Sequence, residues 1–240
     1  MSLHRVRRAV IAASISLSFV FLFAVVALAQ DAAPDKRQNT PGQFDFYVLA
    51  LSWSPTYCAE VSERRTQRRS DPQCSGRPFA FIVHGLWPQY EKGFPSYCQV
   101  PAPRLDRAAI SRMLDLMPSP SLVIHEWDRH GTCSGLPVAA YFETVRKARA
   151  AVKIPEPYVA LATPVSVAPD DVADAFAKAN PGLERAAMAV ACDKTRLTEV
   201  RICMSKDFSF HACPDVARRT CKREKVEMPA MRGERAASAD

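Results

Sequence analysis

The residues of this chain best suited to chemistry lie in two short segments, FIVHGLWPQ at residues 81–89 and HEWDRHGTC at residues 125–133. Together they hold three of the five histidines, namely His84, His125 and His130. Histidine is the one side chain whose unperturbed pKa, about 6.5, lies inside the physiological range. This concentration favours acid–base chemistry near neutral pH, and therefore an enzyme.

The spacing in the second segment defines which side chains can cooperate. On a helix, Glu126 and His130 are four residues apart and share a face, as do His125 and Arg129. A carboxylate beside a histidine can orient its ring, and a cation there favours an anionic ligand. His125 and His130 lie about 140° apart around a helix, which misses the HExxH spacing of zinc proteases. Gly131 predicts a helix end directly after His130.

Hydrophobic patterns predict the elements that position these segments. We expect helices at residues 105–117, 137–152 and 169–180, and strands at residues 45–53, 79–84, 187–192 and 197–205. His84 is thus expected where a strand ends. Helices followed by late, hairpin-like strands favour an α+β fold with a mainly antiparallel central sheet and flanking helices.

The two segments resemble the two signature motifs of the ribonuclease T2 family, HGLWP and HEWxKHGTC. Residues 44–58, FDFYVLALSWSPTYC, and a cysteine-rich C-terminal third extend the similarity over residues 44–229. The chain is similar to a bacterial secreted or periplasmic member of the ribonuclease I type. The resemblance also implies an α+β fold.

The resemblance implies a role for each motif residue. His130 would be the general base that takes the proton of a ribose 2′-hydroxyl, and His84 the general acid that protonates the departing 5′-oxygen. Glu126 and Arg129 would stabilise the phosphorane-like transition state, while His125 would bind phosphate. The family usually has lysine where Arg129 stands, and the two cations are not interchangeable.

The implied activity is that of a metal-independent endoribonuclease. Single-stranded RNA would be cleaved by transphosphorylation to 2′,3′-cyclic phosphate ends, without a cofactor. DNA lacks the attacking hydroxyl and is expected to stay intact.

Base recognition is expected at Trp87, Gln89 and Tyr90. Trp87 could stack on an unpaired base, and core packing is the alternative interpretation of this residue. Low base specificity is expected. Ser52 lies where many members of the family carry glutamine, which bears on contacts to a second base. Structural roles are expected for Trp53, Trp127 and His211.

Eight cysteines in an exported chain predict four disulfides. Spacing alone leaves about 105 pairings. The resemblance implies the pairs Cys58–Cys74, Cys98–Cys133, Cys192–Cys221 and Cys203–Cys213. A metal site is the competing interpretation of clustered cysteines, but no CxxC pair occurs.

The first 29 residues have the pattern of a signal peptide. Basic residues precede an apolar run over residues 9–26, and an A-x-A pattern ends at Ala29. The run is long enough to suit a membrane anchor, but the polar residues that follow favour cleavage after Ala29. We expect a periplasmic or secreted protein with no membrane attachment. Removal of three arginines lowers the formal charge from +7 to +4, which alone does not argue for nucleic acid.

The mature chain is long enough for one core and contains no internal repeat. We expect a flexible segment at residues 30–43, one catalytic domain at residues 44–229 and a disordered tail at residues 230–240. A monomer is expected. The basic run at residues 64–69 is interpreted as a solvated loop.

Two other function classes remain open from the residues. One is a secreted RNA-binding protein that keeps the fold without turnover, although every chemical position of the motifs is filled. The other is a phosphodiesterase that needs a metal. Activity lost with a chelator and restored by zinc would distinguish the latter.

Overall fold

The computed structural model describes residues 38–64 and 71–231. The signal peptide expected at residues 1–29, with its cleavage site after Ala29, lies outside these ranges. Within them, no helix is both long enough and apolar enough to cross a membrane.

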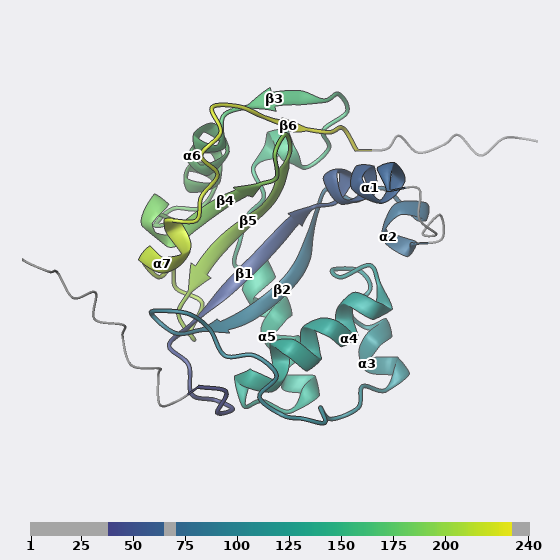
Figure 1. Ribbon diagram of the computed structural model, residues 1–240, viewed down its shortest axis with the longest axis vertical. Coiled ribbons are helices and arrows are strands. Elements are labelled where there is room, and N and C mark those ends of the chain that lie inside the picture. The colour runs from purple at the N-terminus through teal and green to yellow at the C-terminus, as the bar shows by residue number, and fades with distance from the viewer. Residues whose placement is uncertain (1–37, 65–70, 232–240) are drawn as a thin grey trace, which may run out of the picture. The chain divides into compact units, whose positions relative to one another are not determined.

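A four-stranded sheet forms the centre of the domain, with strand order β2–β1–β5–β4 and every neighbouring pair antiparallel (Figure 1). The strands are β1 Phe46–Trp53, β2 Phe81–Gln89, β4 Met188–Cys192 and β5 Leu197–Met204. Two short strands, β3 Val165–Val167 and β6 Val226–Met228, pair separately. The expected α+β fold with an antiparallel central sheet is confirmed.

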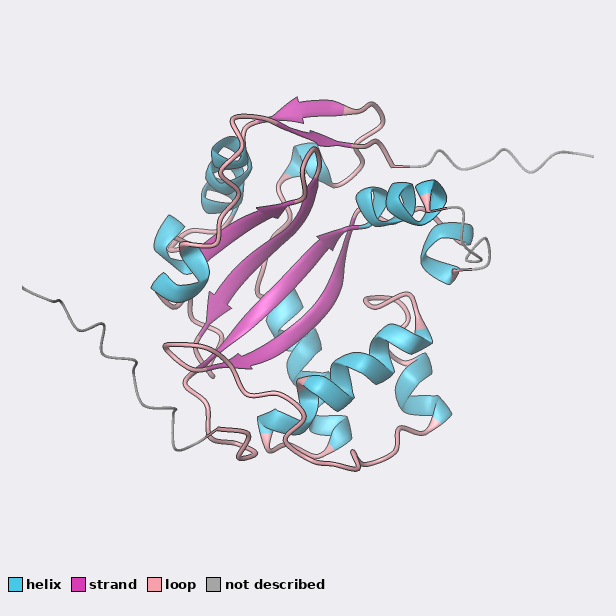
Figure 2. Cartoon of the chain, in the orientation of Figure 1, coloured by secondary structure: helices cyan, strands magenta, loops and turns pink. Residues whose placement is uncertain are grey.

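Helices flank this sheet on both sides. They are α1 Ser54–Glu63, α2 Pro72–Ser75, α3 Arg107–Ser111, α4 Pro120–Arg129, α5 Val138–Ala150, α6 Pro169–Ala179 and α7 Pro214–Ala217. Short 3₁₀ turns occupy Gly131–Ser134, Glu156–Tyr158 and Arg185–Ala187. Helices α4 and α5 pack beside β2, whereas α6 and α7 pack beside β4 (Figure 2). Several helices begin with proline in the first turn, where its missing N–H is not needed.

The two faces of the sheet bury different side chains. Tyr47, Leu49 and Leu51 of β1 join the main hydrophobic core, while Phe46 and Val48 belong to a smaller cluster on the opposite face. Side chains alternate between faces along a strand. The next two positions on the second face carry only a small alanine and a serine. That face therefore has room for polar side chains.

Most predicted elements agree with the structure within two residues, but two differ. The helix expected at residues 105–117 stops at Ser111 and continues as turns. In that turn the Leu116 carbonyl accepts a hydrogen bond from Val83 N at 2.9 Å, which holds the segment along the edge of β2. The strand expected to end at residue 84 instead runs to Gln89, because β1 pairs with β2 as far as Phe46 opposite Gln89.

His84 occupies a β-bulge inside β2. Ala50 pairs with Gly85 and the next residue, Leu51, pairs with Val83, so His84 has no partner in β1. The prediction that it ends a strand is wrong. A bulge bends the strand locally and can re-aim the side chain of the extra residue. The pattern of apolar residues could not reveal this, since a bulge depends on the partner strand.

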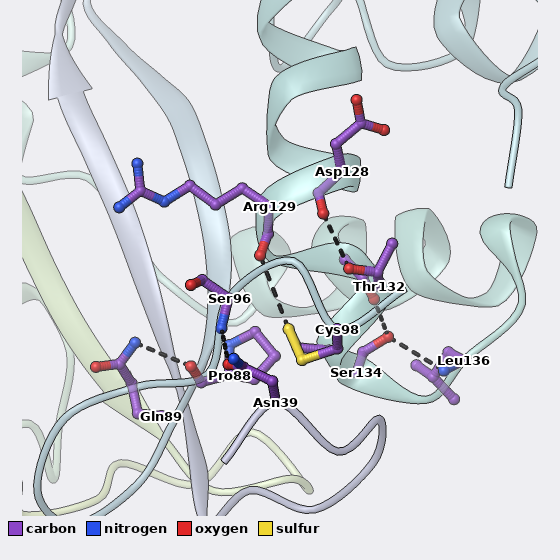
Figure 3. Close-up of a disulfide and its surroundings, with 12 residues drawn as sticks. Asn39, Pro88, Gln89, Ser96, Cys98, Asp128, Arg129, Thr132, Ser134 and Leu136 are labelled. Carbon is purple, nitrogen blue, oxygen red and sulfur yellow. Dashed lines mark hydrogen bonds between the residues drawn. A yellow bond between two sulfur atoms is a disulfide. The ribbon is translucent and has the colours of Figure 1, made fainter. Parts of the chain in front are cut away.

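All four expected disulfides are present, as Cys58–Cys74, Cys98–Cys133, Cys192–Cys221 and Cys203–Cys213. The Cys98–Cys133 bond fastens the loop after β2 to the turn after α4 (Figure 3). Trp53 and Trp127 are buried as expected, and each indole N–H donates to a backbone carbonyl.

The ends of the described chain are attached to the domain. Asn39 Oδ1 accepts from Ser96 N at 3.0 Å, and Gly42 N donates to the Cys133 carbonyl at 2.9 Å. At the other end, Met231 N donates to the Leu161 carbonyl at 2.8 Å. Parts of the segments expected to be flexible or disordered, residues 38–43 and 230–231, therefore contact the fold.

Candidate active site

A cleft of about 350 Å³ opens on the second face of the sheet, between β2 and α4. Seven of the eight expected site residues line it, namely His84, Trp87, Gln89, His125, Glu126, Arg129 and His130; Val48, Phe94, Arg201, Val216 and Arg219 complete the lining. The eighth, Tyr90, is 4% exposed and packs in the main core. The two motifs, separated by residues 90–124 in the sequence, thus meet at one site.

His84 projects from the bulge between two carboxylates. Its Nδ1 lies 2.7 Å from Glu199 Oε1, and its Nε2 lies 3.5 Å from Glu126 Oε1. Burial disfavours the imidazolium, but the Glu199 hydrogen bond and the charges of both carboxylates outweigh it, so the pKa of His84 is raised. This ring therefore holds a proton to higher pH than a free histidine does.

Glu126 lies on the buried face of α4 and is 1% exposed. Its Oε2 accepts a hydrogen bond from Trp87 Nε1 at 2.7 Å. Burial raises the pKa of Glu126 to about 7, against the opposing effects of His84 and Trp87. The close approach of the Glu126 carboxylate to β2 requires glycine at position 85, because a Cβ there would stand 2.0 Å from Glu126 Oε2.

His130 caps the C-terminal end of α4 and is 7% exposed. Its ring lies 5.2 Å from the ring of Trp87, centroid to centroid, and within the described residues its Nδ1 has no hydrogen-bond partner. Burial, reinforced by the charges of Arg129, His84 and His125, lowers the pKa of His130 to about 3. This ring therefore stays neutral.

The helix end expected at Gly131 occurs, but close packing explains the glycine. A Cβ at this position would stand 2.5 Å from Trp127 Cε3 and 2.9 Å from Tyr141 Cε1. The left-handed residue follows one short turn later, at Gly135, with φ of 72°. The small residue thus lets α4 and the next turn pack tightly and fixes where His130 lies.

Arg129 and His125 bring positive charge to the same cleft. The carbonyl of Arg129 faces the Cys98–Cys133 disulfide, while its side chain extends away from that bond (Figure 3). Among the described residues its buried Nε has no hydrogen-bond partner. His125 is exposed, and its pKa is lowered by partial burial and by the charges of Arg129 and His84. Both side chains line the cleft, where they can face an anion.

Phe94 and Arg219 of the cleft lining were missed by the sequence analysis, as were two charged residues of β5 that face the motif residues. Glu199 contacts His84, and Arg201 lines the cleft with its guanidinium carbon 5.4 Å from the centroid of the Trp87 ring. The available signal was the pair of opposite charges at Glu199 and Arg201. They alternate with apolar residues along a predicted strand, and this spacing places both charges on one face. Nothing in the pattern indicated that this face meets a histidine.

His211 lies outside the cleft, as its expected structural role requires. Its ring packs 4.7 Å from that of Phe46, and its Nε2 lies 3.2 Å from Glu91 Oε1. In residues 38–64 and 71–231, no group of three or more histidine, cysteine, aspartate or glutamate side chains is arranged to hold a metal ion.

The family model described as Ribonuclease T2 family matches residues 44–213, a span that includes both motifs and the strand bearing Glu199. The chain belongs to this family. A ribonuclease of Aeromonas hydrophila is 50% identical over 101 residues, 42% of this chain and 43% of that protein. Ribonuclease I of Escherichia coli is 28% identical over 206 residues, 69% of this chain and 77% of that protein.

Solved structures of ribonuclease T2-like proteins share the fold. An RNase-related protein from Calystegia sepium matches with a TM-score of 0.63 at 24% identity, over 79% of this chain and 98% of that one. RNase NT in complex with 5′-AMP matches with a TM-score of 0.55 at 26% identity, over 78% and 98%. The chain spans less than half the length of the first curated relatives it matches.

Proposed function

We propose that this ribonuclease T2 family member is an endoribonuclease that cleaves single-stranded RNA by transphosphorylation. His130 acts as the general base and His84 as the general acid, and no metal takes part. The products are a 2′,3′-cyclic phosphate end and a free 5′-hydroxyl end.

The observation that carries this proposal is the opposite protonation preference of two histidines in one cleft. General acid–base catalysis needs one group that holds a proton at the working pH and one that is free to accept a proton. The pKa of His84 is raised by carboxylates, and the pKa of His130 is lowered to about 3 by burial and cations. Each ring is therefore prepared for the role assigned to it.

The proposed reaction balances in a single displacement. His130 removes the proton of the 2′-hydroxyl, and the 2′-oxygen forms a bond to the adjacent phosphorus. The bond from phosphorus to the 5′-oxygen breaks, and His84 delivers a proton to that oxygen. The enzyme is left with His130 protonated and His84 neutral, so the two protons must be exchanged before the next turnover.

Arg129 and His125 are proposed to bind the scissile phosphate. Charge that grows on the phosphorus oxygens is stabilised best by groups already held in place. The place of both side chains in the lining of the cleft, and the exposed ring of His125, support this assignment. Glu126, with a pKa raised to about 7, can donate a hydrogen bond to a phosphate oxygen in its protonated form.

Base binding is assigned to the aromatic part of the cleft. Trp87 and Phe94 supply ring surfaces there, and Gln89 lies beside them. Gln89 is buried with its amide nitrogen donating to the Pro88 carbonyl, so stacking dominates over hydrogen-bond readout. Stacking tolerates every base, which favours low base specificity.

The proposal is tested by following the ends produced from mixed-sequence RNA. The parent is expected to release cyclic phosphate in the presence of a chelator and to leave DNA of the same sequence intact. His84→Ala and His130→Ala should each lower turnover by about 10²- to 10⁴-fold. His211→Ala is the matched control, since it removes a histidine outside the cleft.

Three results would separate this proposal from other function classes. Tight RNA binding without cyclic product in the parent would leave a binding module. Activity that disappears with chelator and returns with zinc would indicate a metal-dependent phosphodiesterase. Equal turnover in the parent and His84→Ala would remove the two-histidine scheme.

We also infer that the protein works outside the cytoplasm as a monomer. Four disulfides favour an oxidising compartment, and the A-x-A pattern ending at Ala29 supports signal removal there. The mass of the exported protein, measured under non-reducing conditions, is expected to correspond to a chain that begins at Gln30 and has no free thiol. A chain retaining the apolar run would contradict cleavage.

A further inference from the structure

A buried acidic residue of β5 lies beside the cleft without a part in the reaction above. Glu199 is 5% exposed and occupies a central strand, opposite Ser52 of β1 and Ala191 of β4. These small neighbours leave space for its side chain to extend over β1 as far as His84. Burying a carboxylate is costly unless it is paired and hydrogen-bonded, so its partners show what keeps it there.

Both carboxylate oxygens of Glu199 are occupied. Its Oε1 accepts from His84 Nδ1 at 2.7 Å and from Ser52 Oγ at 3.2 Å, while its Oε2 accepts from Arg201 Nε at 2.6 Å. Burial opposes ionisation, but His84 and Arg201 outweigh it and lower the pKa of Glu199. The carboxylate is therefore ionised at neutral pH.

An ionised carboxylate accepts hydrogen bonds and cannot donate them. Nδ1 of His84 must then carry a hydrogen whether the ring is neutral or charged. The proton that distinguishes the two states can reside only on Nε2, the nitrogen on the side of Glu126, whose Oε1 lies 3.5 Å away. Glu199 thus determines which nitrogen of His84 exchanges protons with a substrate.

The bulge explains why His84 needs such a partner. Because it has no partner in β1, and because 38% of its side chain is exposed, neighbouring backbone and packing alone do not fix the ring. Glu199 projects from a strand that is hydrogen-bonded on both sides. A rigid strand thereby orients a residue that lies in an irregular one.

Arg201 links this contact back to the rest of the cleft. Its Nε holds Glu199, and its guanidinium carbon lies 5.4 Å from the ring centroid of Trp87. The indole of Trp87 in turn donates to Glu126, which faces His84. Together with His84 itself, these four side chains form a closed circuit of contacts.

We propose that Glu199 is a positioning residue for the general acid, one that holds the His84 ring with Nδ1–H bound and Nε2–H directed into the cleft, and that Arg201 fixes Glu199 in place. The inference rests on the proposed role of His84. It assigns no contact with substrate to Glu199 itself.

The first test needs no RNA and uses the mature protein labelled with ¹⁵N on histidine. In the parent, the His84 resonances should report a protonated Nδ1 across the titration. Glu199→Gln should lower the pKa of His84 and leave His130 neutral. Glu91→Gln is the matched control, because it removes the carboxylate from the exposed pair with His211 and should leave His84 unchanged.

The second test asks whether Glu199 acts through the acid. On RNA, Glu199→Gln should lower kcat by about 10- to 100-fold, since the imidazole remains but is poorly held. On a ribonucleoside 3′-aryl phosphate, whose leaving group needs no proton, the variant should approach the parent rate. His130→Ala should remain slow on both substrates, because both need the base.

The outcomes are separable. A folded Glu199→Gln with an unchanged His84 pKa, or with equal losses on RNA and on the aryl substrate, would overturn the positioning role. If Glu199→Gln does not fold, Glu199→Asp is used in its place. The aspartate keeps the negative charge, so the pKa of His84 should stay raised while kcat on RNA falls. An unchanged kcat would overturn the positioning role. A parent that does not cleave RNA would refute the proposed function, yet the titration would still decide whether Glu199 holds Nδ1.

Discussion

The two histidines of the cleft lie against the same tryptophan but in opposite electrostatic surroundings. The ring of His84 lies 5.3 Å from that of Trp87 and contacts two carboxylates. The ring of His130 lies 5.2 Å from the same indole and is close to the positive charge of Arg129. One residue type is thus given two pKa values by its neighbours.

The difference follows from the elements that supply those neighbours. On the His84 side, Glu199 reaches over from β5, and Glu126 of α4 supplies the second carboxylate. The His130 side is built by α4, whose last turn presents Arg129 and whose preceding turn presents His125. The carboxylate that is hydrogen-bonded to the proposed acid thus comes from the sheet, whereas the cation beside the proposed base comes from the helix, and the difference can be disturbed from either side.

The largest effect is expected from removing the cation on the helix side. Arg129→Ala should lower kcat/KM by about 10²- to 10³-fold, as for loss of one transition-state donor. It should also raise the pKa of His130 and move the acidic limb of the pH–rate profile to higher pH. Arg129→Lys retains the positive charge and should leave the acidic limb at the pH of the parent. An acidic limb that does not move in Arg129→Ala would contradict the effect of this cation on His130.

The disulfides offer a comparison between stability and positioning. Replacing Cys98 and Cys133 together by alanine should lower the free energy of unfolding by about 2–4 kcal/mol. It should also lower kcat, since Cys133 follows His130 by three residues. The control pair is Cys58 and Cys74, which do not line the cleft.

In denaturant titrations both double variants should be less stable than the parent. Only the first should lose catalysis per folded molecule. Equal kcat values in the two variants would show that the bond between the motifs does not position His130.

Gly85→Ala tests the close packing on the strand side. The new Cβ would stand 2.0 Å from Glu126 Oε2 and 2.3 Å from Trp87 Nε1, so the two groups must separate at a cost of about 1–3 kcal/mol. Thermal unfolding should detect the loss, and kcat should fall with it. Gly93→Ala is the control. A Cβ added at this position would have no atom within 4 Å. The φ of 78° strains an alanine there, so stability should fall while kcat stays unchanged.

The smallest effects concern the pH dependence of stability, where the two histidines should contribute opposite slopes. The folded-state pKa of His84 is raised, so its contribution is present below its unfolded pKa of about 6.5 and is lost as pH rises through the folded value. The pKa of His130 is lowered to about 3, so its contribution is present above about 6.5 and is lost as pH falls toward 3.

Unfolding free energies of His84→Ala and His130→Ala, measured between pH 5 and 8, should therefore depart from the parent in opposite directions. The same pair of shifts predicts a pH–rate profile for kcat/KM with its acidic limb from His130 below 6.5 and its alkaline limb from His84 above it. Slopes of the same sign in both variants would contradict the assignment of neighbours.

The sequence predicted much of the framework, because local patterns determine it. Proline, aspartate and the Pro181–Gly182 pair marked the ends of α6, and alternation marked β1 and β5. The residues of the two motifs were correctly expected to share a cleft through family resemblance. The disulfide pairings came from the same source, since spacing could not choose among them.

What the sequence could not provide depends on contacts between distant segments. The bulge at His84 is defined by the register with β1. The role proposed for Glu199 depends on its contact with His84, which is 115 residues away in the sequence. Tyr90 was expected to contact a base, but its side chain is buried in the main core. A residue one position beyond a strand can turn to either face, so the sequence did not indicate this burial. The helix predicted over residues 105–117 ends at Ser111, and the Leu116 carbonyl near its expected end accepts a hydrogen bond from Val83 of β2, a contact that the local sequence does not reveal.

The hydrogen bond between Val83 N and the Leu116 carbonyl has a consequence for aggregation at high protein concentration. β2 is the outermost strand on its side of the sheet, and an outer strand with free amides can recruit a foreign strand and start aggregation. At Val83, next to the bulge, the outward amide is already taken by a segment of the same chain. The strand that carries His84 is therefore shielded where it is most irregular.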